Sequence, residues 1–277
     1  MGLDIKRKLR ERSEKSYAER KGLSLEHVPY DGASNGSGSA DGPGAVFEIA
    51  TYNVHRWSGV TGGRSWKPDL AKGVIAGLNV DVFALQEVLR PDDYDDPLKQ
   101  IAEELHLHYA FAPTRPHRMG VLGNAILSRW PMNEVRPIDL SFGRLEPRAA
   151  VAAQFEGNGH DVAVVATHLA IVDRIRSRQV RTLLEHPDLQ GSVVLLGDMN
   201  AWRRCPATRE LEREFLEMHH NRNWPPSFPA TRPVLSLDRI YARNARVQDL
   251  HALTTSAAQQ GSDHLPVTAT IRLEEVE

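Results

Sequence analysis

The sequence has little cysteine and no long apolar segment. One cysteine, Cys205, occurs in 277 residues. A disulfide within the chain is therefore impossible, which excludes the small, disulfide-stapled class of secreted proteins and suits a reducing compartment. No apolar run is long enough to cross a bilayer, and the basic residues near the N-terminus are not followed by the apolar segment of a secretion signal. We therefore expect a soluble, cytoplasmic protein and a monomer.

The sequence also lacks an excess of either charge. It carries 34 Lys and Arg against 36 Asp and Glu, a net charge of −2. This balance argues against a protein held on nucleic acid by overall charge, although it leaves room for a local basic groove. Apolar residues make up 41% of the chain, which is enough for a sizeable core.

Composition divides the chain into three parts. Residues 1–30 mix both charge signs, which favours a solvated, partly helical tail, with a weak contact to an anionic surface as the alternative. Residues 31–45 are rich in Gly and Ser and predict a flexible linker. Residues 46–277 are expected to form a single catalytic domain.

Strand-like runs outnumber helical ones in the third part. Strands are predicted at residues 46–52, 81–86, 108–112, 124–128, 148–155, 161–168, 192–197, 237–242, 246–253 and 265–273. Helices are predicted at residues 69–78, 97–106, 173–186 and 207–217, with Asp69 and Asp173 as candidate N-caps. Many strands with interspersed helices predict a layered α/β domain, and strands that follow one another directly favour mixed sheets.

Polar residues stand at the ends of several of these strands. Asp198 and Asn200 close the run 192–197 and point the same way, because strand side chains alternate between faces. An Asx turn that ends the strand is the purely structural alternative. The same kind of residue recurs at other strand ends, where binding sites are usually assembled: Asn53, His55, Gln86, Glu87, His168, Asp238, Asp263 and His264.

These residue types suit one kind of chemistry. Carboxylates and amide oxygens are the ligands that Mg²⁺ or Mn²⁺ prefers, whereas the absence of a His-x-x-x-His motif and of a Cys cluster argues against zinc. A His backed by an Asp can activate water. Together they predict a metal-dependent hydrolase of phosphoesters.

Seven motifs carry these residues in an order and spacing that resemble the endonuclease/exonuclease/phosphatase superfamily, and a poorly characterised bacterial branch of it. The motifs are Thr51-Tyr-Asn-Val54, Leu85-Gln-Glu-Val88, Gly123-Asn-Ala-Ile-Leu-Ser-Arg129, Ala166-Thr-His-Leu169, Gly197-Asp-Met-Asn200, Leu237-Asp-Arg-Ile-Tyr241 and Ser262-Asp-His-Leu-Pro-Val267. The resemblance implies a DNase I-like, four-layer sandwich: two packed mixed β-sheets flanked by helices, with the site at one edge.

The resemblance also implies a role for each residue. Glu87 would be the principal Mg²⁺ ligand, with Asn53 and Asp263 nearby. His264 would be the general base toward the attacking water, oriented by Asp238.

Further roles follow from the same comparison. Asp198 and Asn200 would hold the water or the phosphate, and His168 would donate to a phosphate oxygen or assist the leaving group. Apart from the resemblance, His55 and Arg148 are candidate substrate-binding residues, and for Arg148 a pair with a carboxylate is favoured over contact with a phosphate.

The substrate stays open at this point. A phosphodiester is favoured over a phosphomonoester, and a sequence-nonspecific nuclease competes with a lipid or small-molecule phosphodiesterase. A non-catalytic binding module on the same fold is less favoured, because a binder has no need of these carboxylates and histidines.

Overall fold

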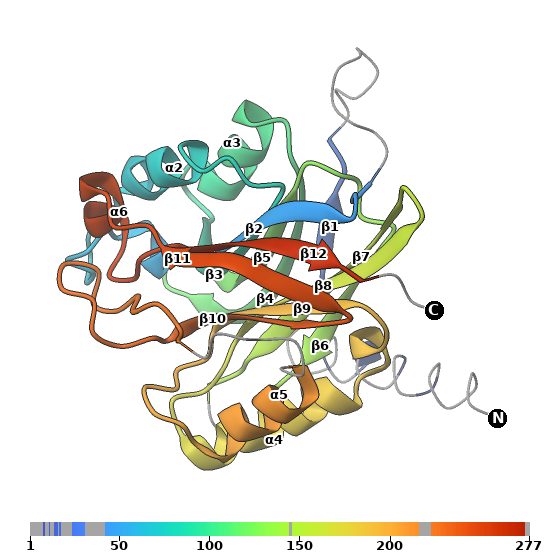
Figure 1. Ribbon diagram of the computed structural model, residues 1–277. Helices are drawn as coiled ribbons and strands as arrows, with labels where there is room; N and C mark the ends of the chain where they lie inside the picture. Colours follow the sequence, from blue (N-terminus) through green and yellow to red (C-terminus); the bar gives the residue numbers. More distant parts are fainter. Residues whose placement is uncertain are drawn as a thin grey trace.

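Two β-sheets pack face to face, and helices cover both outer faces (Figure 1). The computed structural model describes residues Lys8, Glu11, Glu14, Lys15, Tyr17, 24–30, 42–143, 146–215 and 223–274. The four layers confirm the predicted DNase I-like sandwich. Within the described residues, no helix is long and apolar enough to span a membrane.

The larger sheet has seven strands, and the smaller sheet has five. In spatial order, the larger sheet contains β1 (Glu26–Val28), β4 (His108–His117), β5 (Gly120–Ser128), β3 (Val82–Pro91), β2 (Val46–Asn53), β12 (Val267–Leu273) and β11 (Ala245–Ala252). The smaller sheet contains β10 (Asp238–Arg243), β9 (Val193–Asp198), β8 (His160–His168), β7 (Ala149–Gly157) and β6 (Glu134–Asp139). Strand β2 runs parallel to β3, and β8 runs parallel to β9.

The helices separate between the two outer faces. Helices α2 (Pro68–Ala76), α3 (Pro97–Glu104) and α6 (Ser256–Gly261) cover the seven-stranded sheet, and α4 (Asp173–Glu185) and α5 (Pro206–Phe215) cover the five-stranded sheet. Two short 3-10 helices complete the described elements, η2 (His55–Trp57) and η3 (Pro187–Leu189).

Strand β3 shows how the layers form. Val82 and Ala84 face the other sheet, while Phe83 and Leu85 face the helices. Because both faces of this strand are buried, it reads as a continuous apolar run rather than an alternating one. A strand with both faces covered is held rigidly, so the residues at its end have fixed positions.

Two parts of the N-terminal region contact the folded domain more closely than a solvated tail and a flexible linker would. Strand β1 lies in the predicted solvated tail, yet it pairs with β4 and extends the larger sheet. Tyr17 is also buried, and its hydroxyl donates to the carbonyl of Pro113. At the linker, Asn158 donates to the carbonyl of Gly42, so residues 42–45 belong with the domain. Residues 31–41 lie outside the described part of the chain.

Several local predictions also needed correction. Strand β6 was missed because Pro137 interrupts it, and proline is tolerated there only because β6 is an edge strand. Asp69 and Asp173 are not N-caps, since Lys67 and Val172 occupy those positions. Both aspartates lie in the first helical turn, where a negative charge interacts favourably with the helix dipole.

Candidate active site

The predicted residues meet at one edge of the sandwich and come from both sheets. Asn53 ends β2 in the larger sheet, and Asp198 ends β9 in the smaller one. Asn53 Nδ2 donates to Asp198 Oδ2 at 3.2 Å, and both side chains are buried. The site therefore bridges the interface between the two sheets.

A glycine brings β8 and β9 together at this edge. His168 and Asp198 are direct neighbours in the parallel pair, next to Gly197. A Cβ atom on Gly197 would lie 1.9 Å from the carbonyl oxygen of Thr167, and the backbone there has φ +145°. Only glycine fits such a close approach at this φ.

The turn after β9 is both structural and part of the site. Asn200 N donates to Asp198 Oδ1 at 2.8 Å, which is the Asx turn expected from the sequence. The Asn200 side chain donates to the carbonyl of Leu169 at 2.9 Å and lies 3.0 Å from His168 Nε2. The amide of Asn200 is thus oriented by Leu169, so that its N–H faces the His168 ring.

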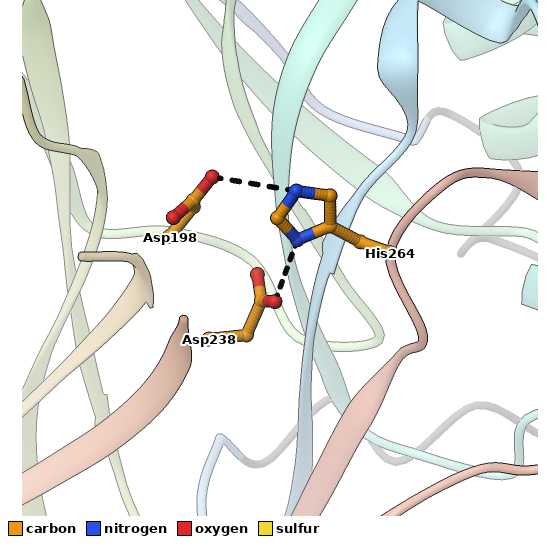
Figure 2. A group of neighbouring side chains, drawn as sticks. All are labelled: Asp198, Asp238 and His264. Carbon is orange, nitrogen blue, oxygen red and sulfur yellow. Dashed lines mark hydrogen bonds and ion pairs between the residues drawn. The ribbon is translucent and has the colours of Figure 1, made fainter. Parts of the chain in front are cut away.

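His264 lies between two buried carboxylates (Figure 2). Its Nδ1 is 2.7 Å from Asp238 Oδ2, and its Nε2 is 3.7 Å from Asp198 Oδ2. Ser227 Oγ donates to the same Asp238 oxygen at 2.6 Å. An imidazole held in this way has Asp238 on one nitrogen and presents the other toward Asp198.

Burial and charge determine the protonation of this group. Burial alone would lower the pKa of His264, but the negative charges of Asp238 and Asp198 raise that pKa to about 10. Burial raises the pKa of Asp198 to about 6, with Asp238 adding to the effect and His264 opposing it. Perturbed pairs of this kind in a buried cluster are typical of catalytic sites.

The same three residues form a donor set that fits a metal ion. Ligand atoms of Asp198, Asp238 and His264 lie within 4.8 Å of one another. Asp238 Oδ1 is buried and has no hydrogen-bond partner, which is costly for an acceptor unless another group binds it. Two carboxylates and an imidazole are ordinary ligands for a divalent cation.

Glu87 stands on a β-bulge. The pairing between β3 and β5 shifts register between Leu85 and Val88, and Glu87 itself has φ +52°. A bulge redirects side chains, and a positive φ in a residue other than glycine is common at functional sites. The Glu87 carboxylate lies 3.3 Å from Arg56 Nε and is about one-third exposed, with 29% of its side chain accessible.

The remaining predicted metal ligand, Asp263, is held by His55. His55 Nδ1 lies 3.2 Å from Asp263 Oδ1, and the backbone N of His55 donates to Asn53 Oδ1 at 3.0 Å. His55 is mostly buried, with 13% of its side chain exposed. In this arrangement His55 positions Asp263 and Asn53.

His168 has arginines in its surroundings. Burial lowers its pKa well below the ordinary value, and the charges of Arg148 and Arg115 add to the effect. Both arginines bind one carboxylate, since Glu146 lies 3.0 Å from Arg148 and 2.7 Å from Arg115. The predicted carboxylate pairing of Arg148 is therefore present, next to the site.

Three residues to which no role was assigned from the sequence support the predicted ones, although Ser262 opens one of the seven motifs. Ser227 holds Asp238, Ser262 Oγ donates to the carbonyl of Asn53 at 2.6 Å, and the Phe228 ring lies 4.9 Å from the ring of His264. Ser227 and Phe228 lack a local signal, because a serine and a phenylalanine are ordinary residues in a loop. Their roles arise from contacts between distant segments.

Comparison with known proteins agrees with this geometry. Residues 51–264 match the Endonuclease/Exonuclease/phosphatase family. The chain is 28% identical over 248 residues to the uncharacterized protein YbhP of Escherichia coli K12, which covers 82% of this chain and 96% of YbhP. An endonuclease/exonuclease/phosphatase from Beutenbergia cavernae has a TM-score of 0.68 at 23% identity, over 83% of this chain and 72% of that one. The mannosyl-6-phosphatase Bt3783 of Bacteroides thetaiotaomicron has a TM-score of 0.64 at 18% identity, over 81% and 99%.

The solved structures share the fold, and the family match spans the site from the strand of Asn53 to His264. The resemblance predicted from the seven motifs is confirmed. This chain belongs to the endonuclease/exonuclease/phosphatase family.

Proposed function

We propose that the chain is an Mg²⁺-dependent hydrolase that cleaves a phosphodiester by in-line attack of water. The family's members are generally metal-dependent phosphoester hydrolases. The observation that carries the proposal is the buried Asp238–His264–Asp198 cluster, in which Asp238 holds one nitrogen of His264 at 2.7 Å. A phosphoesterase needs such a positioned base and nearby hard oxygen ligands.

His264 acts as the general base in its neutral form. Its raised pKa of about 10 would fall beside a bound cation, because positive charge nearby offsets the charges of Asp238 and Asp198. Asp238 occupies Nδ1, so Nε2 is the nitrogen that takes a proton from the attacking water. The water oxygen bonds to phosphorus while the bond from phosphorus to the leaving oxygen breaks, and the leaving oxygen receives a proton from solvent. Asp198, 3.7 Å from Nε2, positions the water and stabilises the imidazolium.

The charges around the site suit a phosphate. Glu87, Asn53 and Asp263, the ligands that the family resemblance implies, would hold Mg²⁺, and Mn²⁺ would be a substitute, because oxygen ligands dominate this set. The buried group Asp198, Asp238 and His264 also fits a cation by its donor atoms, but in this proposal it supplies the base. When bound, the cation supplies positive charge to the phosphate oxygens. Arg148 is close enough for its charge to lower the pKa of His168 and adds further positive charge at the phosphate.

A phosphomonoester is the second candidate substrate. One structural relative, Bt3783, is described as a mannosyl-6-phosphatase, but at 18% identity it supports the fold and not the substrate. A non-catalytic binding module is disfavoured by the cluster, because burying two carboxylates around a histidine is costly without a function.

Turnover of bis-p-nitrophenyl phosphate with Mg²⁺ tests the proposal. His264→Gln and Glu87→Gln should each abolish it, whereas the matched exposed controls His251→Gln and Glu103→Gln should retain it. Folding is checked by thermal melting of every variant. Undiminished turnover in folded His264→Gln and Glu87→Gln would refute the proposal.

A further inference from the structure

Exposed apolar side chains gather around the site edge of the smaller sheet. Among the described residues, the exposed large apolar side chains are Val46, Leu70, Tyr94, Ile171, Val172, Trp202 and Val234. Four of these, Ile171, Val172, Trp202 and Val234, lie in loops that follow β8, follow β9 and precede β10. We call these four residues the apolar rim. The same strand ends carry His168, Asp198 and Asp238, so the rim borders the site.

Buried arginines fasten the rim loops to one another. Arg176 donates to the carbonyls of Ile171 at 3.0 Å and Asn200 at 2.7 Å. Arg239 donates to the carbonyls of Ala201 at 2.7 Å and Ser236 at 3.2 Å. Both guanidinium groups are bound to backbone oxygens, so the loops cannot easily rearrange.

The side chains of the apolar rim are exposed to solvent, although the backbones of their loops are held in place. Ile171 is 59% exposed, Val172 55%, Trp202 52% and Val234 66%. Trp202 and Val234 line one cavity, and Arg203, beside Trp202, pairs with Asp173, beside Val172. The rim residues are therefore neighbours in space, and a group of exposed apolar side chains marks an interaction surface. Three of the four are aliphatic and have no π face for a nucleobase, which disfavours single-stranded nucleic acid as the partner.

Cations border the rim. Arg174, Arg203, Arg204 and Arg232 are exposed next to rim residues in the sequence. Asp173 pairs with Arg203 and Glu212 pairs with Arg204, so a positive excess remains over these acids. A cavity of about 460 Å³ lies between Trp202 and Val234 and is lined by Arg203 and Arg204. Aliphatic and aromatic tips flanked by arginines match the interface of an anionic bilayer.

We propose that the apolar rim enters the surface of an anionic phospholipid bilayer and delivers the headgroup phosphodiester of a phospholipid to the site. The substrate assignment rests on the proposed hydrolase function, whereas the surface contact does not. Loops from three adjacent strand ends carry both the rim and the site, so a membrane that covers the rim places its headgroups at the site edge.

Vesicle flotation of the full chain tests the contact. Vesicles of phosphatidylcholine with equimolar phosphatidylglycerol should carry the protein, and pure phosphatidylcholine vesicles should carry less. The pair Ile171→Ser and Trp202→Ser should weaken this binding by about tenfold or more, since two large apolar groups no longer enter the interface. Arg174→Gln should weaken it by about fivefold. Val46→Ser is the matched control, because Val46 is 43% exposed at the opposite end of β2 and should change nothing.

Flotation tests the membrane contact, and hydrolysis tests the substrate, so the two can be judged separately. Glu87→Gln should float like the native chain, which shows that binding does not need turnover. In the Ile171→Ser, Trp202→Ser variant, the ratio of phospholipid hydrolysis in vesicles to bis-p-nitrophenyl phosphate hydrolysis should fall by about tenfold. Vesicle binding that survives these rim substitutions, or binding of a single-stranded oligonucleotide that depends on the same residues, would overturn the inference. Loss of hydrolysis with intact flotation would count against the hydrolase alone.

Discussion

Replacing Asp238 by Asn would separate the charge of this residue from its shape. The carboxylate holds His264 Nδ1 at 2.7 Å and accepts from Ser227 at 2.6 Å, in a buried position. Asparagine keeps the size but can turn its amide N–H toward the ring, which would favour the wrong tautomer of His264. Nε2 would then carry the proton and could not accept one from water.

The size of the effect follows from the charge that is lost. Two opposite unit charges about 4 Å apart at an effective dielectric constant of about 20 attract by about 4 kcal/mol. That energy corresponds to about three pKa units, so the pKa of His264 in Asp238→Asn should fall from about 10 to near its ordinary range. If only the charge mattered, the lower pKa would increase the neutral, proton-accepting fraction of His264 near pH 7. The tautomer argument instead predicts a loss of about 10³- to 10⁴-fold in kcat.

Measurement distinguishes the effect of the lost charge from the effect of the changed tautomer. Turnover of bis-p-nitrophenyl phosphate from pH 6 to 9 gives kcat and KM, and NMR titration of the ring gives the His264 pKa. We expect a large loss in kcat, little change in KM and a lowered pKa, with exposed Asp161→Asn as the control. A kcat within about tenfold of the native value, together with the lowered pKa, would show that Asp238 does not orient the base.

Four other outcomes are expected. Gly197→Ala should lower the free energy of unfolding by at least about 3 kcal/mol in urea titration, because its Cβ meets a backbone oxygen at 1.9 Å. Ser227→Ala should cost about 1–3 kcal/mol, measured in the same way, since Asp238 loses a buried donor. In metal-free protein, the ion pair of His264 stabilises the folded state fully below pH 6.5, and this stabilisation is lost as the pH rises toward about 10. His264→Gln should therefore flatten the dependence of the unfolding free energy on pH, and an unchanged dependence would contradict the ion pair. Mg²⁺ should raise the melting temperature of the native chain and not that of Glu87→Gln.

The strand ends were predictable because each combines a local pattern with a polar terminus. The run 192–197 is apolar and bounded, and Asp198 and Asn200 follow it, so the sequence alone indicated a strand and its polar end. The same reasoning placed His168 and Asp238. The packing of the two sheets brings these strand ends together, and this packing cannot be predicted from the sequence of any single segment.

The missed features depend on partners far along the chain. Strand β1 has three residues and becomes a strand only because the edge of β4 is open beside it. Ser227 bonds Asp238 across a loop. The bulge at Glu87 arises from a register shift against β5, which no pattern within β3 predicts. Periodicity describes a segment, whereas these features belong to pairs of segments.

The order of the strands along the chain has a consequence for the order in which the candidate site is assembled. The middle of the sequence, β6 to β10, builds the smaller sheet, while the larger sheet takes strands from both flanks. Strand β12 pairs with β2 and follows His264 directly in the sequence. A chain synthesised only as far as β10 therefore lacks both β12 and His264, however well the smaller sheet has folded. The candidate site, which joins Asp198 of the smaller sheet to Asn53 of the larger one, takes its final form only when β12 has paired with β2.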